Sequence, residues 1–142
     1  MTVDVEIENR TGWRVDEPAV ERAVQETLAA EGVADGELGV IFVDEAQMAE
    51  LNDTYRGKPE PTDVLSFPLD ARDEVPDGLP RQLGDVVVCP AVASSDGTPI
   101  ATLLVHGVLH LVGWDHEQDA GEMLERQATL TQKVEDVGAD PS

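Results

Sequence analysis

The sequence has few of the residues that cross-link small proteins or anchor proteins in membranes. Its 142 residues include one cysteine, Cys89, which excludes an internal disulfide and a zinc site built from cysteines. Aromatic residues make up 4% of the chain, and no apolar run reaches the roughly 20 residues that a bilayer span requires. The first six residues alternate and are acidic, unlike a secretory leader. We therefore expect a cytoplasmic protein with no membrane partner.

Basic residues are also scarce. Nine lysines and arginines stand against thirty aspartates and glutamates, which gives a net charge of −21. Such a surface repels polyanions and argues against nucleic-acid binding through a broad basic face. A site for nucleic acid in this protein must gather its positive charge locally.

The hydrophobic pattern predicts an α/β fold in one globular domain, residues 1–142. Period-two alternation and short β-branched runs predict strands at 3–8, 38–43, 64–67 and 86–88. Helical periodicity predicts helices at 16–32, from 45 to about 55, at 99–112, and from about 120 to 134. This order indicates a small mixed β-sheet of about four strands with helices. The helix at 99–112 is apolar nearly all round, so it should be the buried central helix.

Several boundaries follow from local signals. Asp44 with Gln47 three residues later is typical of a capping box. Thr98 followed by Pro99 predicts a capping hydroxyl and a proline in the first turn, and Gly113 predicts the end of the same helix.

Two segments, 70–81 and 94–97, contain glycine and polar residues and are predicted to be loops. The segment 91–99 is too short for a helix of its own. In the last predicted helix, the residues expected to face the core are Met123, Leu124, Ala128 and Leu130.

All three histidines of the chain lie in one short segment. His106 and His110 are four residues apart on the predicted central helix, about 40 degrees apart around its axis, so they share a face. Gly113 then allows the chain to turn back and bring His116 to the same point. One alternative is that these are core histidines bonded to backbone. Leaving several imidazoles unpaired would cost about 1–3 kcal/mol each, and a metal ion removes that cost. The three imidazoles predict one zinc ion with an open fourth position.

The same histidine spacing occurs in zinc peptidases, where a glutamate after the first histidine is the general base. Here that position is Gly107, and no other glutamate lies on the helix. Asp115 is a candidate to orient a histidine ring. The other nearby carboxylates are interpreted as a solvated helix start: Glu117, Asp119 and Glu122.

The histidine segment, together with three upstream blocks, resembles the YbeY family of bacterial endoribonucleases, the rRNA maturation factors. The blocks are residues 51–58 (LNDTYRGK), 61–68 (PTDVLSFP) and 83–89 (LGDVVVC). The resemblance implies a zinc-dependent endoribonuclease directed at single strands, acting chiefly at the 3′ end of small-subunit rRNA and in ribosome quality control. It also implies that the three histidines bind zinc and that Arg56 is catalytically important. The expected partners are single-stranded or ribosomal RNA and the small ribosomal subunit, not DNA.

Arg56 and Lys58 are the candidate catalytic cations. Phosphodiester cleavage builds negative charge on the non-bridging oxygens, and a planar guanidinium can hold two of them. With zinc, these two cations would form one positive cleft in an acidic protein. The alternative for Arg56 is an ordinary surface arginine, and Thr62 and Asp63 are equally well explained as turn formers.

The sequence departs from the family pattern in two places. The chain is shorter between Cys89 and His106, where relatives usually place a helix, and Trp114 stands where the family commonly has tyrosine. Two other functions stay open: a zinc hydrolase of peptide-like substrates, and a non-catalytic ribosome-assembly factor with a structural zinc.

Overall fold

The computed structural model describes residues 3–69, 81–115 and 119–141. Its main sheet has the strand order β1-β3-β5-β4, formed by β1 (Val3–Asn9), β3 (Gly36–Phe42), β5 (Gln82–Val88) and β4 (Val64–Pro68). β4 is antiparallel to β5, and the other pairs are parallel. The helices are α1 (Glu17–Ala30), α2 (Glu45–Arg56), α3 (Pro90–Asp96), α4 (Ile100–Leu111) and α5 (Glu122–Thr131). The predicted α/β fold with a mixed four-stranded sheet is confirmed.

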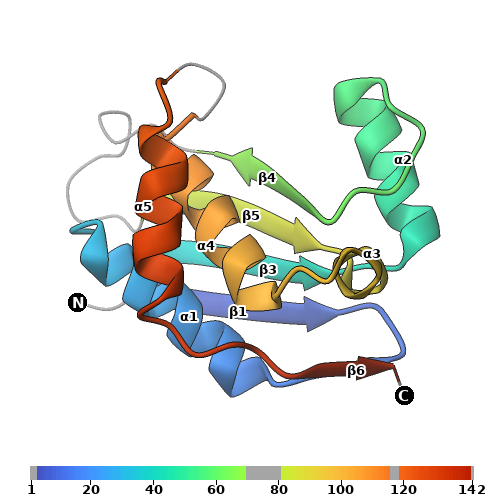
Figure 1. Ribbon diagram of the computed structural model, residues 1–142, viewed down its shortest axis with the longest axis horizontal. Helices are drawn as coiled ribbons and strands as arrows, with labels where there is room; N and C mark the ends of the chain where they lie inside the picture. Colours follow the sequence, from blue (N-terminus) through green and yellow to red (C-terminus); the bar gives the residue numbers. More distant parts are fainter. Residues whose placement is uncertain (1–2, 70–80, 116–118, 142) are drawn as a thin grey trace.

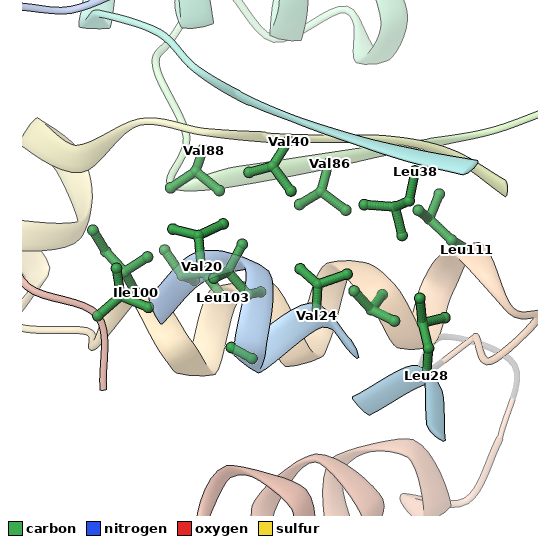
Figure 2. Packing of buried hydrophobic residues seen from close by; sticks show 14 of the residues in the cluster. Val20, Val24, Leu28, Leu38, Val40, Val86, Val88, Ile100, Leu103 and Leu111 are labelled. Carbon is green, nitrogen blue, oxygen red and sulfur yellow. The ribbon is translucent and has the colours of Figure 1, made fainter. Parts of the chain in front are cut away.

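One face of the sheet is covered by α1 and α4, and α5 packs against α4 on the same side (Figure 1). Along α1, Val20, Val24 and Leu28 recur every four residues and are fully buried. Figure 2 shows these α1 residues and α4 facing the valines of β3 and β5. Burying each such side chain contributes about 1.5–3 kcal/mol. As predicted, α4 is the central helix, because it contacts β4, β5, α1 and α5.

The opposite face of the sheet is covered less extensively. Met48 of α2 packs there against Leu65, Val87 and Cys89. Burial raises the pKa of the Cys89 thiol, so the neutral thiol is favoured. Cys89 is fully buried and serves as a small core residue.

The two predicted helix starts have different outcomes. The side chain of Asp44 accepts a hydrogen bond from the Gln47 backbone N–H at 2.8 Å, which confirms it as the cap of α2. The prediction for Thr98 was wrong by one position, because Pro99 is the N-cap of α4. The Thr98 backbone N–H instead donates to the carbonyl of Ala93 at 2.9 Å and closes the preceding helix.

The predictions of a loop at 94–97 and of no room for a helix at 91–99 were also wrong, because α3 extends to Asp96. Pro90 lies in the first turn of α3, and Gly97 ends it with a φ of 72°. These two residues fit the preference for proline at helix starts and glycine just beyond helix ends. Ala93 anchors the short helix in the core. The other predicted loop, 70–81, lies almost entirely outside the described residues.

The last predicted helix is shorter and buries a narrower stripe than expected. Met123 and Leu130 of α5 are buried, whereas Leu124 is 50% exposed and Ala128 is also exposed. The prediction for these two residues was wrong because α5 lies at the periphery and contacts α4 along one edge. A small antiparallel sheet that the sequence pattern did not predict is formed by β2 (Trp13–Val15) and β6 (Ala139–Pro141).

Candidate functional site

A cleft of 620 Å³ brings together the candidate histidines and the candidate arginine. It is lined by Arg56, Thr62, Asp63, Val64, Leu65, Ser66, Pro68, His106, His110, Gly113, Trp114 and Asp115. We call the α4 residues His106 and His110 the histidine wall, and Arg56 at the end of α2 with Thr62 and Asp63 from the segment after it the arginine wall. β4 contributes four further lining residues.

The histidine wall has the geometry that its spacing predicts. The rings of His106 and His110 are 4.7 Å apart between centroids, with their planes at 74°. Both side chains are partly buried. Gly113 has a φ of 107°, a backbone conformation that favours glycine, and it lies on the route to His116. His116 itself lies outside the described residues.

Two imidazoles on one helix face fit the nitrogen ligands that zinc prefers. Within residues 3–69, 81–115 and 119–141, no group of three histidine, cysteine, aspartate or glutamate side chains is placed to hold a metal ion. The third ligand therefore depends on His116, and zinc binding stays a prediction.

The ring of His106 has a specific partner that the sequence analysis missed. Its Nδ1 lies 2.6 Å from Oε1 of Gln127 on α5. An amide oxygen only accepts, so the proton of this bond belongs to Nδ1 and the lone pair of the neutral ring is on Nε2. Gln127 lies between Met123 and Leu130 on the buried stripe of α5, and a polar residue at that position was the available signal.

Gly107 allows α4 to pack closely against the sheet. A Cβ at this position would lie 2.6 Å from Cγ1 of Val86 and 3.2 Å from Oγ of Ser66. The Ser66 hydroxyl also donates to the Gly107 carbonyl at 3.2 Å. A side chain at position 107 would therefore enter the sheet contact, so the place of the peptidase base is closed sterically.

The arginine wall is held by α2 and by a buried asparagine. Arg56 is the last residue of α2, and Gly57 ends that helix with a φ of 70°. The side chain of Asn52, which is buried, donates to the carbonyl of Glu60 at 2.7 Å and anchors the segment after the helix. Lys58 is exposed and is not among the described lining residues of the cleft.

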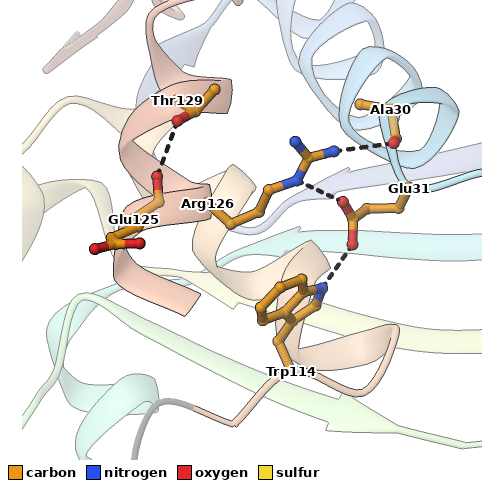
Figure 3. A network of polar contacts seen from close by, with 6 residues as sticks. All are labelled: Ala30, Glu31, Trp114, Glu125, Arg126 and Thr129. Atoms are coloured by element: carbon orange, nitrogen blue, oxygen red, sulfur yellow. Dashed lines mark hydrogen bonds and ion pairs between the residues drawn. The ribbon is translucent and has the colours of Figure 1, made fainter. Parts of the chain in front are cut away.

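A polar network joins the far end of the cleft to α1 and α5 (Figure 3). The indole Nε1 of Trp114 donates to Oε1 of Glu31 at 2.6 Å, and Nε of Arg126 donates to the other carboxylate oxygen at 2.8 Å. Arg126 also donates to the carbonyl of Ala30 at 3.0 Å. The network fixes a lining residue of the cleft to two helices.

The remaining candidate residues fall into two groups. Thr62, Asp63 and Asp115 line the cleft. Asp119 accepts backbone hydrogen bonds from Gly121 and Met123 at 2.9 and 3.0 Å, which agrees with its interpretation as part of a helix start. Glu117 lies outside the described residues.

Comparisons with known proteins agree on one family. A family model described as Endoribonuclease YbeY matches residues 5–135. Proteins named Endoribonuclease YbeY from Acidothermus cellulolyticus and Mycolicibacterium smegmatis are 42% and 37% identical, over 89% and 92% of this chain and 88% and 83% of theirs. The solution structure of TM1509 from Thermotoga maritima aligns with a TM-score of 0.58 and 28% identity, over 91% of this chain and 87% of that chain. The chain belongs to the endoribonuclease YbeY family.

Proposed function

We propose that this protein is a zinc-dependent endoribonuclease that cleaves single-stranded segments of ribosomal RNA. Its substrate would be the 3′ end of small-subunit rRNA, with a role in maturation and in ribosome quality control. The family membership supports an RNA-cleaving enzyme. The observation that carries the proposal is the convergence of Arg56 from α2 with His106 and His110 from α4 on one cleft.

The proposed metal ligands are His106, His110 and His116. A zinc ion held by them would supply Lewis-acid chemistry for phosphodiester hydrolysis. The buried helix α4 holds the first two imidazoles in a fixed relation, so little reorganisation is needed.

Arg56 is proposed to hold the non-bridging oxygens of the scissile phosphate. Its guanidinium offers paired N–H donors whose fork matches two phosphate oxygens. Asp63 and Asp115 line the same cleft and would repel phosphates that do not sit against the arginine. Lys58 is proposed as a peripheral cation that attracts RNA without touching the reacting atoms.

The overall charge of −21 argues for weak RNA binding by the isolated chain. We therefore propose that the small ribosomal subunit is the physiological partner, because it would present the RNA end in place. The protein would act in the cytoplasm as one domain of residues 1–142. No helix among the described residues is long and apolar enough to cross a membrane.

The runner-up function, a zinc hydrolase of peptide-like substrates, is disfavoured by the packing at Gly107. A glutamate there would have to displace Val86 and Ser66 before it could reach the cleft. A ribosome-assembly factor with a structural zinc would use the same ligands, and it differs from our proposal only in lacking cleavage.

The test separates metal binding from cleavage. Arg56→Ala should lower cleavage of a single-stranded rRNA fragment by about 100-fold or more, because a preorganised donor to the transition state is lost. Zinc content, measured by mass spectrometry, should stay at the wild-type value. The matched control is Arg22→Ala, which removes an exposed arginine from α1. Wild-type cleavage by Arg56→Ala, or no cleavage by zinc-loaded wild-type protein, would reject the proposal.

A further inference from the structure

We propose that Gln127 is a positioning residue that fixes the tautomer and ring orientation of His106. This inference rests on the proposed metal site and extends it to α5. With the proton held on Nδ1 by Gln127, His106 would bind the metal ion through Nε2.

The contact is short, and with the amide oxygen facing the ring His106 is the donor and Gln127 the acceptor. The distance from His106 Nδ1 to Gln127 Oε1 is 2.6 Å. Because the amide oxygen has no proton, the neutral ring must donate through Nδ1. A ring that rotates would lose this bond, and a ring that changes tautomer would keep it only if the carboxamide also turned over to present its NH2 group, so the contact couples ring orientation and tautomer to the orientation of Gln127.

Gln127 is itself held from both sides along α5. Met123, four residues earlier, and Leu130, three residues later, pack against Val105 and Leu109 of α4. These spacings place Gln127 on the same face of the helix as the two anchors. The carboxamide therefore reaches His106 from a helix that is already packed on α4.

A second contact fixes the helix against α1. Arg126, next to Gln127 in the chain, bonds the carboxylate of Glu31 and the carbonyl of Ala30 (Figure 3). The Arg126 and Glu31 side chains are 31% and 10% exposed, so this ion pair is largely shielded from water. Apolar packing of α5 on α4 and the polar contacts of Arg126 with α1 together fix where Gln127 lies beside α4.

If Gln127 had only a structural role, Gln127→Met would change neither the tautomer of His106 nor the affinity for zinc. Methionine has nearly the same length and would fill the same space in an apolar stripe, so Gln127→Met should fold with unchanged or higher stability. It would remove only the acceptor. Partners of metal-ligating histidines typically change metal affinity by about 10–100-fold when they are lost.

The first measurement uses metal-free protein with ¹⁵N-labelled histidine. The chain has three histidines, so each signal can be assigned by its loss in a histidine-to-alanine variant. Long-range ¹H–¹⁵N spectra at a pH of about 9, where imidazoles are neutral, should show His106 protonated on Nδ1. Gln127→Met should lose this preference, and Gln127→Glu, which keeps an acceptor, should retain it. His106 protonated on Nε2 in the wild type would overturn the inference.

The second measurement is zinc affinity by competition with a chromophoric chelator. Gln127→Met and Gln127→Ala should each weaken zinc binding by about 10–100-fold, with Gln127→Glu close to wild type. The matched control is Gln132→Met, at an exposed position just beyond α5, which should bind zinc like wild type. Wild-type affinity in Gln127→Met would overturn the inference.

The two measurements separate this inference from the proposed nuclease. Neither reads RNA cleavage, so an inactive enzyme leaves both expectations unchanged. If the wild type binds no zinc, the metal site is rejected, and the tautomer of His106 still decides whether Gln127 positions the ring.

Discussion

The two walls of the cleft are built in opposite ways. The histidine wall belongs to α4, most of whose residues are buried, and it contacts the sheet through Gly107 and a helix through Gln127. The arginine wall consists of the exposed end of α2 and the segment after it, which is anchored by one buried side chain, Asn52.

This difference separates two tasks that the proposed reaction imposes. A metal site requires ligands held within fractions of an ångström, and a packed core provides this rigidity. An arginine that binds the phosphates of a flexible RNA must be exposed to solvent and long enough to reach them. Changes in the histidine wall should therefore affect metal binding and stability, and changes in the arginine wall should affect cleavage alone.

The largest effect is expected from His110→Ala. Removing a ligand should weaken zinc binding by more than the factor of about 100 that marks the loss of a supporting partner, and cleavage should fall with it. The control is Thr102→Ala, which alters the same face of α4 two turns earlier. Chelator competition measures the affinity, and stoichiometric zinc in His110→Ala would remove the histidine wall from the metal site.

Gly107→Ala tests the close packing of the histidine wall. The added Cβ meets Val86, and such overpacking costs about 1–3 kcal/mol. Alanine regains about 1 kcal/mol of helix propensity, so the free energy of unfolding in urea should fall by a net ~0–2 kcal/mol.

The control for Gly107→Ala is the same change in a Val86→Ala background. Without the valine methyls the helix propensity remains together with the 3.2 Å approach of the new Cβ to Oγ of Ser66, so the substitution should then be neutral or stabilise the protein by up to about 1 kcal/mol. A loss of equal size in both backgrounds would show that Val86 does not set the packing.

Asn52→Ala tests the anchor of the arginine wall. Loss of the bond to Glu60 should let the segment after α2 shift, and displacement of Arg56 should lower cleavage by about 10-fold. Zinc affinity should not change. The control is Asp53→Ala, at an exposed neighbouring position. Parallel losses of zinc and cleavage in Asn52→Ala would mean that the two walls are not independent.

The smallest effect is expected from Lys58→Ala. The side chain is exposed, and screening by salt weakens its attraction for RNA. Cleavage should fall by less than about threefold at roughly 0.15 M salt, where the Debye length is near 8 Å, and by more at low salt. A loss as large as that of Arg56→Ala would place Lys58 at the reacting phosphate.

The sequence predicted the parts of the site that depend on local periodicity. The shared face of His106 and His110 follows from their spacing, and the start of α2 follows from its cap at Asp44. These features require only the geometry of one helix. The predicted helix after Asp44 ended one residue early, because Arg56 is the last residue of α2 and does not lie in the loop after it.

The parts that were missed depend on contacts between elements. Gln127 lies on the core-facing stripe of α5, but its partner His106 is identified only when α5 is placed against α4. Helix α3 was missed because its polar residues resemble a turn, whereas its packing through Ala93 is a tertiary effect. The pairing of β2 with β6 joins residues far apart in the chain, which no local pattern reveals.

The contact between Gly107 and β4 also limits how substitutions can change the substrate preference of this protein. Since Ser66 bonds the backbone of α4 directly, β4 and α4 are coupled where they line the cleft. Widening the cleft between β4 and α4 would require simultaneous replacements on both elements, which a single substitution does not provide. New substrate preferences would therefore arise through the turn at 57–63 and through residues 113–115, where one change can alter the opening without disturbing the core.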